Sequence, residues 1–212
     1  MTGYYAKLSQ RGVLLIRGPD THTFLQGQTT CDLDLLTPER AISGASCTPQ
    51  GRLVCDFRLL GCGEDNWLMC MHRGICDNSA AMFGKYIVFS KAEISNASEQ
   101  WCSFAVWGEN VAGELGLGGG QRDQVGEQDG AWWVQTDDAG ERFECHVPTD
   151  TAAAFTAVLA GRFQPGPEQA WQLAEINSGQ GHLEPETIEM FIPQMLNYQL
   201  TGHISFNKGC YT

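Results

Sequence analysis

The sequence predicts an α+β protein with two similar β-α-β subdomains and largely antiparallel sheets. Strand-like and helix-like segments follow the order strand, helix, strands, helix, and this order occurs twice along the 212 residues. The turn Thr-Pro-Gln-Gly separates two strand-like runs, residues 41–47 and 52–60, which is typical of an antiparallel hairpin. No Gly-x-Gly-x-x-Gly follows the first strand, so a Rossmann fold is not expected.

In the first half, residues 11–17 form an apolar strand that Gly18-Pro19 closes. Asp20 is expected to cap a short helix, which Gly27 ends in a polar Gln-Gly-Gln loop. Residues 52–60 alternate between an apolar face and a mixed face, as in a strand that lines a polar cavity.

The next segments continue this half of the chain. Residues 67–72 read as a strand, 74–86 as a helix, and 87–95 as a returning strand.

The second half begins with a strand at 101–108 and a short helix at 111–117. Residues 118–130 are too rich in glycine and polar groups for a packed element, and a hairpin is expected to follow them. A helix over 149–161 is expected to take Thr149 or Asp150 as its cap.

After a helix that starts near Pro167, the segment 186–212 is irregular. It carries four apolar anchors between polar groups: Met190, Phe191, Ile192 and Leu196. Long irregular segments with buried anchors are often ligand-binding loops.

Charge and composition exclude several classes of protein. A formal net charge of −12, with 13 basic residues scattered along the chain, argues against direct and tight nucleic-acid binding. The longest aliphatic run, residues 13–16, is far shorter than a membrane span, and the N-terminal residues lack the apolar region of a signal peptide. We therefore expect a cytoplasmic protein without a membrane association.

Nine cysteines are many for this length, yet none is arranged as Cys-x-x-Cys, the usual signature of a zinc site or redox dithiol. Most should therefore be reduced, and those upstream of residue 210 should act as small hydrophobic residues. No metal site is expected.

Four segments resemble the YgfZ-type folate-binding family, which is related to the aminomethyltransferase (T-protein) of the glycine cleavage system. They are FLQGQTTCDL (24–33), TPQGRLVCDFRLL (48–60), KYIVFSKAEI (85–94) and FIPQMLNYQLTGHISFNKGCYT (191–212). The last five residues look like the opening of the family signature Lys-Gly-Cys-Tyr-x-Gly-Gln-Glu.

This resemblance implies two α+β subdomains, at 1–98 and 99–166, around a central folate-type cavity. Residues 167–212 would return to that cavity, and a C-terminal β-barrel domain would be missing because of truncation after Thr212.

The resemblance also implies several residues that bind tetrahydrofolate. Trp171 matches a family tryptophan and would stack on the folate rings, although an ordinary core tryptophan is equally expected. Asn177 stands where the aminomethyltransferases place an acid that holds the pterin edge. Because an amide offers one acceptor and one donor, it binds that edge less well than a carboxylate, and Glu175 is a possible substitute.

Asp56 lies in the strand that carries a pair of aspartates in the aminomethyltransferases, but here the pair reads Cys55-Asp56. Only one of two neighbours on a strand can face a cavity. A plain surface or salt-bridged Asp56 is therefore as reasonable as an Asp56 in the site.

The family motifs add three further residues to the expected folate site: Gln28, Gln194 and Tyr211. The Gln26-Gly27-Gln28 segment would form part of the cavity rim, or else a capping loop without a ligand role.

Cys210 is the strongest candidate for a reactive residue. Lys208 lies two positions away, and a nearby cation lowers the pKa of a thiol. The alternative for Cys210 is a buried cysteine in a tight turn, and the alternative for Lys208 is binding the glutamate tail of folate.

Two functions follow from the resemblance. The first is a tetrahydrofolate-binding accessory protein for the assembly or repair of iron–sulfur clusters in enzymes such as the tRNA methylthiolation enzyme, with an indirect link to tRNA. The second is a folate-dependent aminomethyltransferase, which the departures at Cys55-Asp56 and Asn177 disfavour. A remnant without activity is a third possibility.

Overall fold

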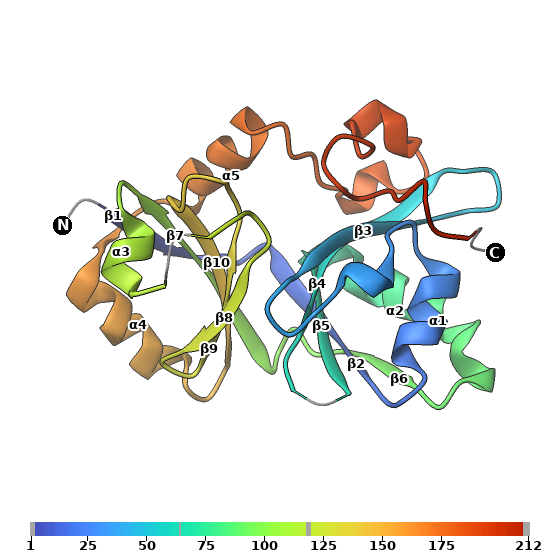
Figure 1. Ribbon diagram of the computed structural model, residues 1–212, viewed down its shortest axis with the longest axis horizontal. Helices are drawn as coiled ribbons and strands as arrows, with labels where there is room; N and C mark the ends of the chain where they lie inside the picture. Colours follow the sequence, from blue (N-terminus) through green and yellow to red (C-terminus); the bar gives the residue numbers. More distant parts are fainter. Residues whose placement is uncertain (1–2, 64, 118–119, 210–212) are drawn as a thin grey trace. The chain divides into compact units, whose positions relative to one another are not determined.

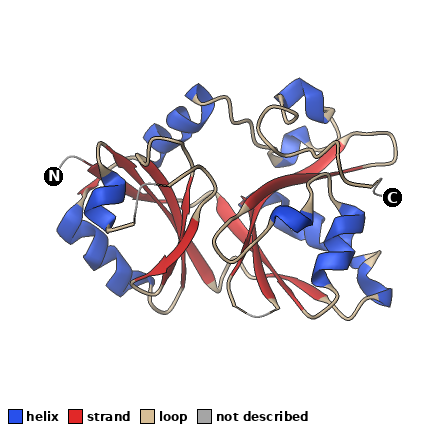
Figure 2. Cartoon of the chain, in the orientation of Figure 1, coloured by secondary structure: helices blue, strands red, loops and turns tan. Residues whose placement is uncertain are grey.

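A computed structural model describes residues 3–63, 65–117 and 120–209 and contains two β-sheets with helices (Figures 1 and 2). Among the described strands, every pair is antiparallel except the two-residue contact between β1 and β11. The α+β class with largely antiparallel sheets is therefore confirmed. The similarity of the two halves and the central cavity stay predictions.

The described residues form two compact units, and neither is a single continuous segment. One unit combines the segments Met1–Ser9 and Ser98–Asn177, and the other combines Gln10–Ala97 and Ser178–Thr212. The expected first subdomain, 1–98, therefore differs from the structure because its first strand pairs with β7 in the other sheet. The expected final segment, 167–212, is divided after Asn177.

The first unit contains the six-stranded sheet. In spatial order its strands are β11 (Gln164–Pro165), β1 (Gly3–Lys7), β7 (Trp101–Gly108), β10 (Arg142–Pro148), β9 (Ala131–Gln135) and β8 (Val125–Gln128). Its helices are α3 (Val111–Leu115), α4 (Ala152–Arg162) and α5 (Glu168–Asn177). Helices α3 and α4 cover one face, where Leu115 and Phe155 pack on strand residues such as Phe104 (Figure 1).

The second unit contains the five-stranded sheet. In spatial order its strands are β3 (Ile42–Cys47), β4 (Leu53–Gly61), β5 (Asn66–His72), β2 (Arg11–Arg17) and β6 (Glu93–Asn96). Its helices are α1 (Thr21–Gln28) and α2 (Cys76–Gly84), with short 3-10 turns η1 (Leu33–Leu35), η2 (Arg73–Ile75), η3 (Ile87–Phe89), η4 (Pro185–Thr187) and η5 (Pro193–Leu196). Phe24 and Phe83 on the helices pack against the strand side chains.

The expected hairpin forms, with β3 and β4 antiparallel on either side of residues 48–52. The predicted alternation of side chains between the two faces of β4 is also confirmed. Leu53, Cys55 and Phe57 face the core beneath the helices. Asp56 and Arg58 point to the opposite face, although both are buried.

The region around the first helix differs from expectation in two ways. Gln26-Gly27-Gln28 is the last turn of α1 and not a loop, because Gly27 keeps a helical backbone. Asp20 does not cap α1 with its side chain; its carboxylate accepts from the Lys91 backbone N–H at 2.7 Å.

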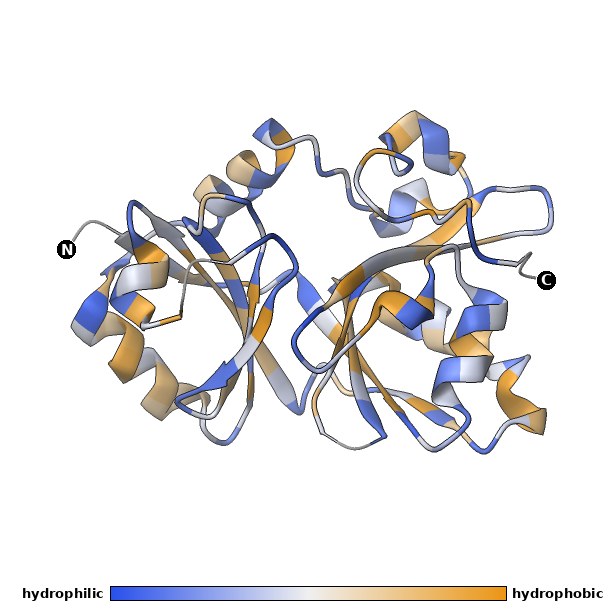
Figure 3. Cartoon of the chain, viewed as in Figure 1, coloured by the Kyte–Doolittle hydropathy of each residue, from blue (hydrophilic) through white to orange (hydrophobic). Residues whose placement is uncertain are grey.

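The expected strand over 87–95 is also shorter than predicted. Its apolar start forms η3, where Val88 and Phe89 are exposed, so their hydrophobicity does not reflect burial (Figure 3). Only Glu93–Asn96 pair with β2.

Two predictions in the first unit were also wrong. Part of the expected loop 118–130, Val125–Gln128, pairs with β9 as the strand β8. The N-cap of α4 is Thr151, and neither Thr149 nor Asp150 caps it; the Thr149 hydroxyl contacts the Cys102 sulfur at 3.6 Å.

The cysteine chemistry agrees with the expectation of small hydrophobic residues. None of the eight described cysteines forms a disulfide, and only Cys47 and Cys62 are partly exposed. Burial raises the pKa of the Cys55 thiol to about 12, which keeps it protonated and unreactive at neutral pH.

In the segment after α5, Phe191 and Leu196 pack against the core of the second unit, whereas Met190 is 56% exposed. Met190 is therefore not the buried anchor that the sequence predicted. Throughout the described ranges, no helix has both the length and the apolar character needed to cross a bilayer.

Gly44 provides a test of the packing between β3 and β4. A Cβ atom at this position would clash with the Cys31 sulfur and lie 2.7 Å from the Phe57 ring. Gly44→Ala should therefore lower the free energy of unfolding by about 1–3 kcal/mol. The control is Gly27→Ala in α1, where an added Cβ meets nothing within 4 Å. This substitution should stabilise the helix by about 0.5–1 kcal/mol. Urea unfolding measures the stability of both variants, and equal stabilities would contradict the tight packing at Gly44.

Candidate functional site

The centre of the candidate site is the carboxylate of Asp56 on β4. Only 2% of this residue is exposed, and both of its oxygens accept hydrogen bonds. Oδ1 accepts from the Leu183 backbone N–H at 2.8 Å, and Oδ2 lies 2.8 Å from Nδ1 of His182. The segment after α5 thus supplies the partners of a charge on β4.

The electrostatics of this pair follow from its burial. Desolvation alone would raise the pKa of Asp56. The hydrogen bond and charge of His182, with the Leu183 N–H and the charge of His203, together lower that pKa below its ordinary value. Asp56 is therefore a buried, ion-paired carboxylate and not a plain surface residue.

Tyr198 and His203 lie in the same unit and extend this polar cluster. Their rings stack, with centroids 4.2 Å apart and planes 12° from parallel. The Tyr198 hydroxyl donates to the Gly181 carbonyl at 3.0 Å, and burial together with the charge of Asp56 raises the pKa of this phenol. The phenol therefore stays protonated and acts as a donor.

Lys208 is the next expected site residue, and its ammonium group binds the end of α1. Nζ donates to the carbonyl oxygens of Gln26, Thr29 and Cys31 at 2.6, 2.8 and 2.9 Å. Carbonyls at a helix C-terminus attract a cation because they lack helical partners and carry the negative end of the dipole. The ammonium group of Lys208 thus makes three hydrogen bonds to backbone carbonyl oxygens.

The helix α5 carries Trp171 in the first unit. The indole is 1% exposed and packs against Leu8, Ala105 and Trp107, so no ring face is open for stacking. Its Nε1–H is buried and has no hydrogen-bond partner among the described residues.

The two polar candidates on α5 are on different faces. Glu175, four residues after Trp171, shares the buried face, whereas Asn177 is exposed. The buried acid near the indole is therefore Glu175.

Gln28 lines a cavity of about 620 Å³ within the second unit. The cavity lies between α2 and the β3–β4 turn, and its polar lining includes Asn78, Lys85, Tyr86 and Glu189. Neither Asp56 nor Lys208 lines it. Gln28 is thus part of a cavity wall, separate from the cluster around Asp56.

The remaining expected residues have different placements. The Gln26 side chain is structural: Nε2 donates to Asp32 at 2.9 Å, and Oε1 accepts from the Leu33 backbone at 2.8 Å. Gln194 is exposed at the surface. Cys210 and Tyr211 lie outside the described residues, so their roles stay predictions.

Sequence reasoning missed three histidines: His72, His182 and His203. Burial lowers the pKa of His72 below its ordinary value. The negative charges of Glu184 and Asp56 act in the opposite direction and raise this pKa, and the charge of His182 adds to the lowering. No motif signals these residues, because they come from three separated segments. Within the described ranges, no group of three or more His, Cys, Asp or Glu side chains is arranged to hold a metal ion.

A family model described as the GCVT N-terminal domain matches residues 6–115, just over half of the 212 residues. The chain belongs to this family. The matched range includes both Asp56 and the α1 end that holds Lys208, and the YgfZ-type resemblance of the sequence is confirmed.

The similar curated relatives carry the name tRNA-modifying protein YgfZ. The protein from Klebsiella pneumoniae is 31% identical over 93% of this chain, and that from Pectobacterium carotovorum is 30% identical over 92%. The chain spans about three fifths of the length of these relatives, 61% and 59% respectively.

A solved structure with the same fold is the glycine cleavage system aminomethyltransferase T from Bartonella henselae. It matches with a TM-score of 0.65 and 19% identity, over 77% of this chain and 47% of that protein. This likeness shows the shared fold.

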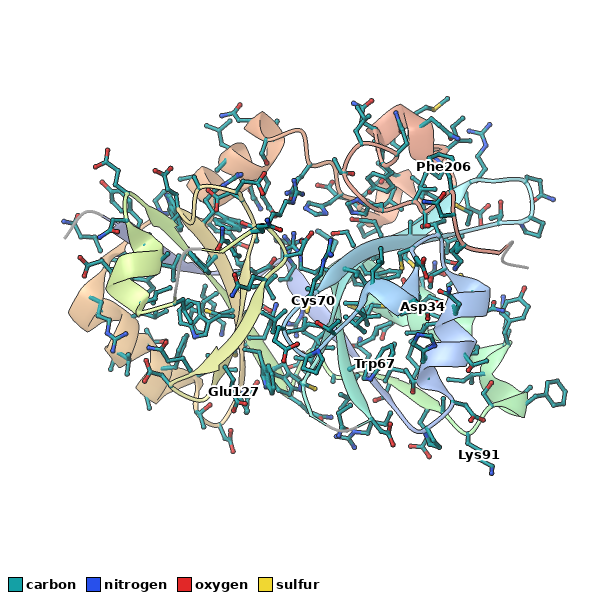
Figure 4. All side chains as sticks on the ribbon, viewed as in Figure 1. Asp34, Trp67, Cys70, Lys91, Glu127 and Phe206 are labelled. Carbon is teal, nitrogen blue, oxygen red and sulfur yellow. The ribbon has the colours of Figure 1, made fainter. Side chains whose placement is uncertain are left out.

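Lys208→Met tests the anchoring of the C-terminal segment. Methionine keeps the length of the side chain but loses its donors, so the variant should lose about 1.5–3 kcal/mol of unfolding free energy. The matched control is Lys91→Met, because the Lys91 side chain lies at the surface (Figure 4) and should change stability by less than about 0.5 kcal/mol. Urea unfolding measures both. Equal losses would show that the three carbonyl contacts do not anchor the segment.

Proposed function

We propose that this chain is part of a tetrahydrofolate-binding accessory protein that acts in iron–sulfur cluster assembly or repair and thereby in tRNA modification. The observation that carries this proposal is the match to the GCVT N-terminal domain together with relatives named tRNA-modifying protein YgfZ. The proposal places the protein in the cytoplasm, with iron–sulfur enzymes such as the tRNA methylthiolation enzyme as its partners.

Folate binding is supported by the residues of α5. The buried Nε1–H of Trp171 has no partner in the described structure, and leaving such a donor unsatisfied is costly. A bound pterin or aminobenzoyl group would supply an acceptor for it once the packing around the indole, which is 1% exposed, opens. On the same buried face, Glu175 carries a carboxylate, whereas Asn177 carries an amide and is exposed.

The alternative function, aminomethyl transfer, receives less support from β4. Its catalysis would need an acid that meets the reacting group, and both Asp56 oxygens already accept hydrogen bonds. Cys55, which takes the place of a second acid, faces the core beneath the helices. The chain thus favours binding over group transfer.

A net charge of −12 fits an indirect link to tRNA, because direct phosphate binding needs clustered basic residues. The proposed thiol chemistry belongs to Cys210, two positions after Lys208. Lys208 binds carbonyl oxygens at and just after the end of α1, so in this proposal it positions the signature and is not the group that binds the glutamate tail.

Tetrahydrofolate titration tests the binding role. Tryptophan fluorescence of the wild-type chain should fall in a saturable way, because bound folate lies close to an indole. Trp171→Phe keeps an aromatic core residue but removes the N–H donor, and should weaken binding about tenfold. Trp132→Phe is the control, on β9 of the same sheet, and should bind as the wild type does. A folded protein that shows no quenching would rule out the folate role.

The thiol role has its own test in cells that lack the full-length protein. Full-length protein carrying Cys210→Ala should fail to restore methylthiolated tRNA, measured by mass spectrometry of the nucleosides, because the reactive thiolate is absent. Cys62→Ala, which removes a partly exposed thiol elsewhere, should restore it. Full rescue by Cys210→Ala would eliminate the thiol from the proposal.

A further inference from the structure

The cavity that Gln28 lines in the second unit takes no part in the cluster around Asp56. It measures about 620 Å³, within the range that small-molecule sites occupy, and lies between α2 and the β3–β4 turn. Every residue that lines it belongs to this one unit, and neither Asp56 nor Lys208 is among them. The cavity can therefore bind a ligand independently of the proposed folate site.

Two residues that line the cavity, Glu189 and Lys85, carry charges of opposite sign. The backbone N–H of Glu189 donates to the Leu53 carbonyl at the start of β4 at 2.8 Å, and the Leu53 N–H donates to the Phe191 carbonyl at 2.8 Å. Lys85 directly follows α2, and its backbone N–H donates to the Met82 carbonyl at 3.2 Å. The backbone of each charged residue is thus held by a strand or a helix of the second unit.

The two charges pair neither with each other nor with the rest of the described chain. Within that part of the chain, no ion pair or side-chain hydrogen bond engages the Lys85 ammonium group or the Glu189 carboxylate. The same holds for the side chains of Gln28, Asn78 and Tyr86, which also line the cavity. The wall thus offers a ligand one cation, one anion and three neutral polar groups.

Apolar side chains form much of the remaining wall. Pro49, Val54, Ala81 and Met82 line the cavity, and Val54 is 6% exposed. Burying an apolar group of a ligand against such side chains is favourable, because it removes apolar surface from water. The wall therefore suits a ligand that combines charges with an apolar group.

We infer that this cavity binds a zwitterionic amino acid with an apolar side chain. The carboxylate of the ligand pairs with Lys85, its ammonium group pairs with Glu189, and its side chain lies against Val54 and Met82. This site goes beyond the proposed function, because the residues of the folate proposal on α5 and β4 do not contribute to it.

The opposite charges select against other classes of ligand. A ligand that fills the cavity removes water from both charges, and a charge that loses its hydration without gaining a partner is unfavourable. A ligand that is only an anion leaves Glu189 unpaired, and one that is only a cation leaves Lys85 unpaired. Tetrahydrofolate is in the first class, since its glutamate tail has two carboxylates and no ammonium group.

Cys47 reports directly on occupancy, because it lines the cavity and is partly exposed. Alkylation of the purified chain with iodoacetamide, followed by peptide mass spectrometry, measures the reaction rate at each cysteine. L-Phenylalanine at about ten times its Kd should slow the alkylation of Cys47 about tenfold, since the thiol then reacts only in the unoccupied fraction. Cys62 is the internal control: it is also partly exposed but does not line the cavity, so its rate should not change.

Two analogues of this probe each lack one charge. Phenylpropanoate has no ammonium group and phenylethylamine has no carboxylate, while both keep the phenyl group. Each should protect Cys47 with a Kd about tenfold higher than that of L-phenylalanine, because one charge-assisted hydrogen bond is lost. This comparison uses the wild-type chain, so it does not depend on the stability of any variant.

Substitutions assign each charge of the ligand to its partner. Lys85→Met should raise the Kd of L-phenylalanine about tenfold without weakening the binding of phenylethylamine, which has no carboxylate. Glu189→Gln should raise the Kd of L-phenylalanine to a similar extent without weakening the binding of phenylpropanoate. Lys91→Met and Glu93→Gln are matched controls, because neither residue lines the cavity, and they should bind as the wild type does. Urea unfolding verifies that each variant is folded.

Four outcomes would overturn the inference. The first is equal protection of Cys47 by L-phenylalanine and both analogues, which would exclude the pairing of charges. The second is equal slowing at Cys62, which would show that the effect does not come from the cavity. The third is a wild-type chain that none of L-phenylalanine, L-leucine and L-methionine protects. The fourth is protection by tetrahydrofolate but not by L-phenylalanine, which would assign the cavity to folate.

Discussion

The burial of one negative charge organises the second unit. Moving a carboxylate out of water is strongly unfavourable unless hydrogen bonds and an opposite charge replace its hydration. Asp56 on β4 obtains both from His182 and Leu183, so the segment after α5 has to lie against this strand. Later in the same segment, the positive charge of Lys208 is bound by carbonyl oxygens at and just after the end of α1.

These two attachments connect the candidate chemistry to the fold. Residues 178–209 contain only short 3-10 turns (Figure 2), and helical propensity alone would not hold such a segment in place. Its hydrogen bonds to β4 and α1 do so instead. His182 and the residues next to the signature are therefore positioned by a carboxylate of the sheet and by carbonyl oxygens at and just after a helix end. Rigid supports of this kind suit binding sites.

Much of the fold could be predicted because its signals are local. The Thr-Pro-Gln-Gly turn identified the β3–β4 hairpin, and the alternation along residues 52–60 identified the two faces of β4. Two local signals gave wrong predictions. Gly27 was expected to end the first helix, but it lies within α1. The hydrophobic Val88 and Phe89 were expected in a strand, but they are exposed.

The site was harder to predict, because its key contact joins residues 126 positions apart. Nothing near His182 in the sequence indicates that its partner is Asp56. Lys208 was expected to act on a thiol or on a ligand, since no local pattern shows that its ammonium group meets the end of α1. The family motifs located both segments but not this contact.

The division of the chain into two units also affects how it leaves the ribosome. Nearly all of the unit that ends at Asn177 is continuous in sequence, so it can close as soon as that residue has emerged. Most of the other unit, Gln10–Ala97, is synthesised before residue 98, but this unit also needs residues 178 onward, which follow Asn177 in the chain. Until those residues emerge, Asp56 lacks the His182 and Leu183 partners that it has in the folded unit, so the pairing of this carboxylate belongs to a late step in the formation of the unit.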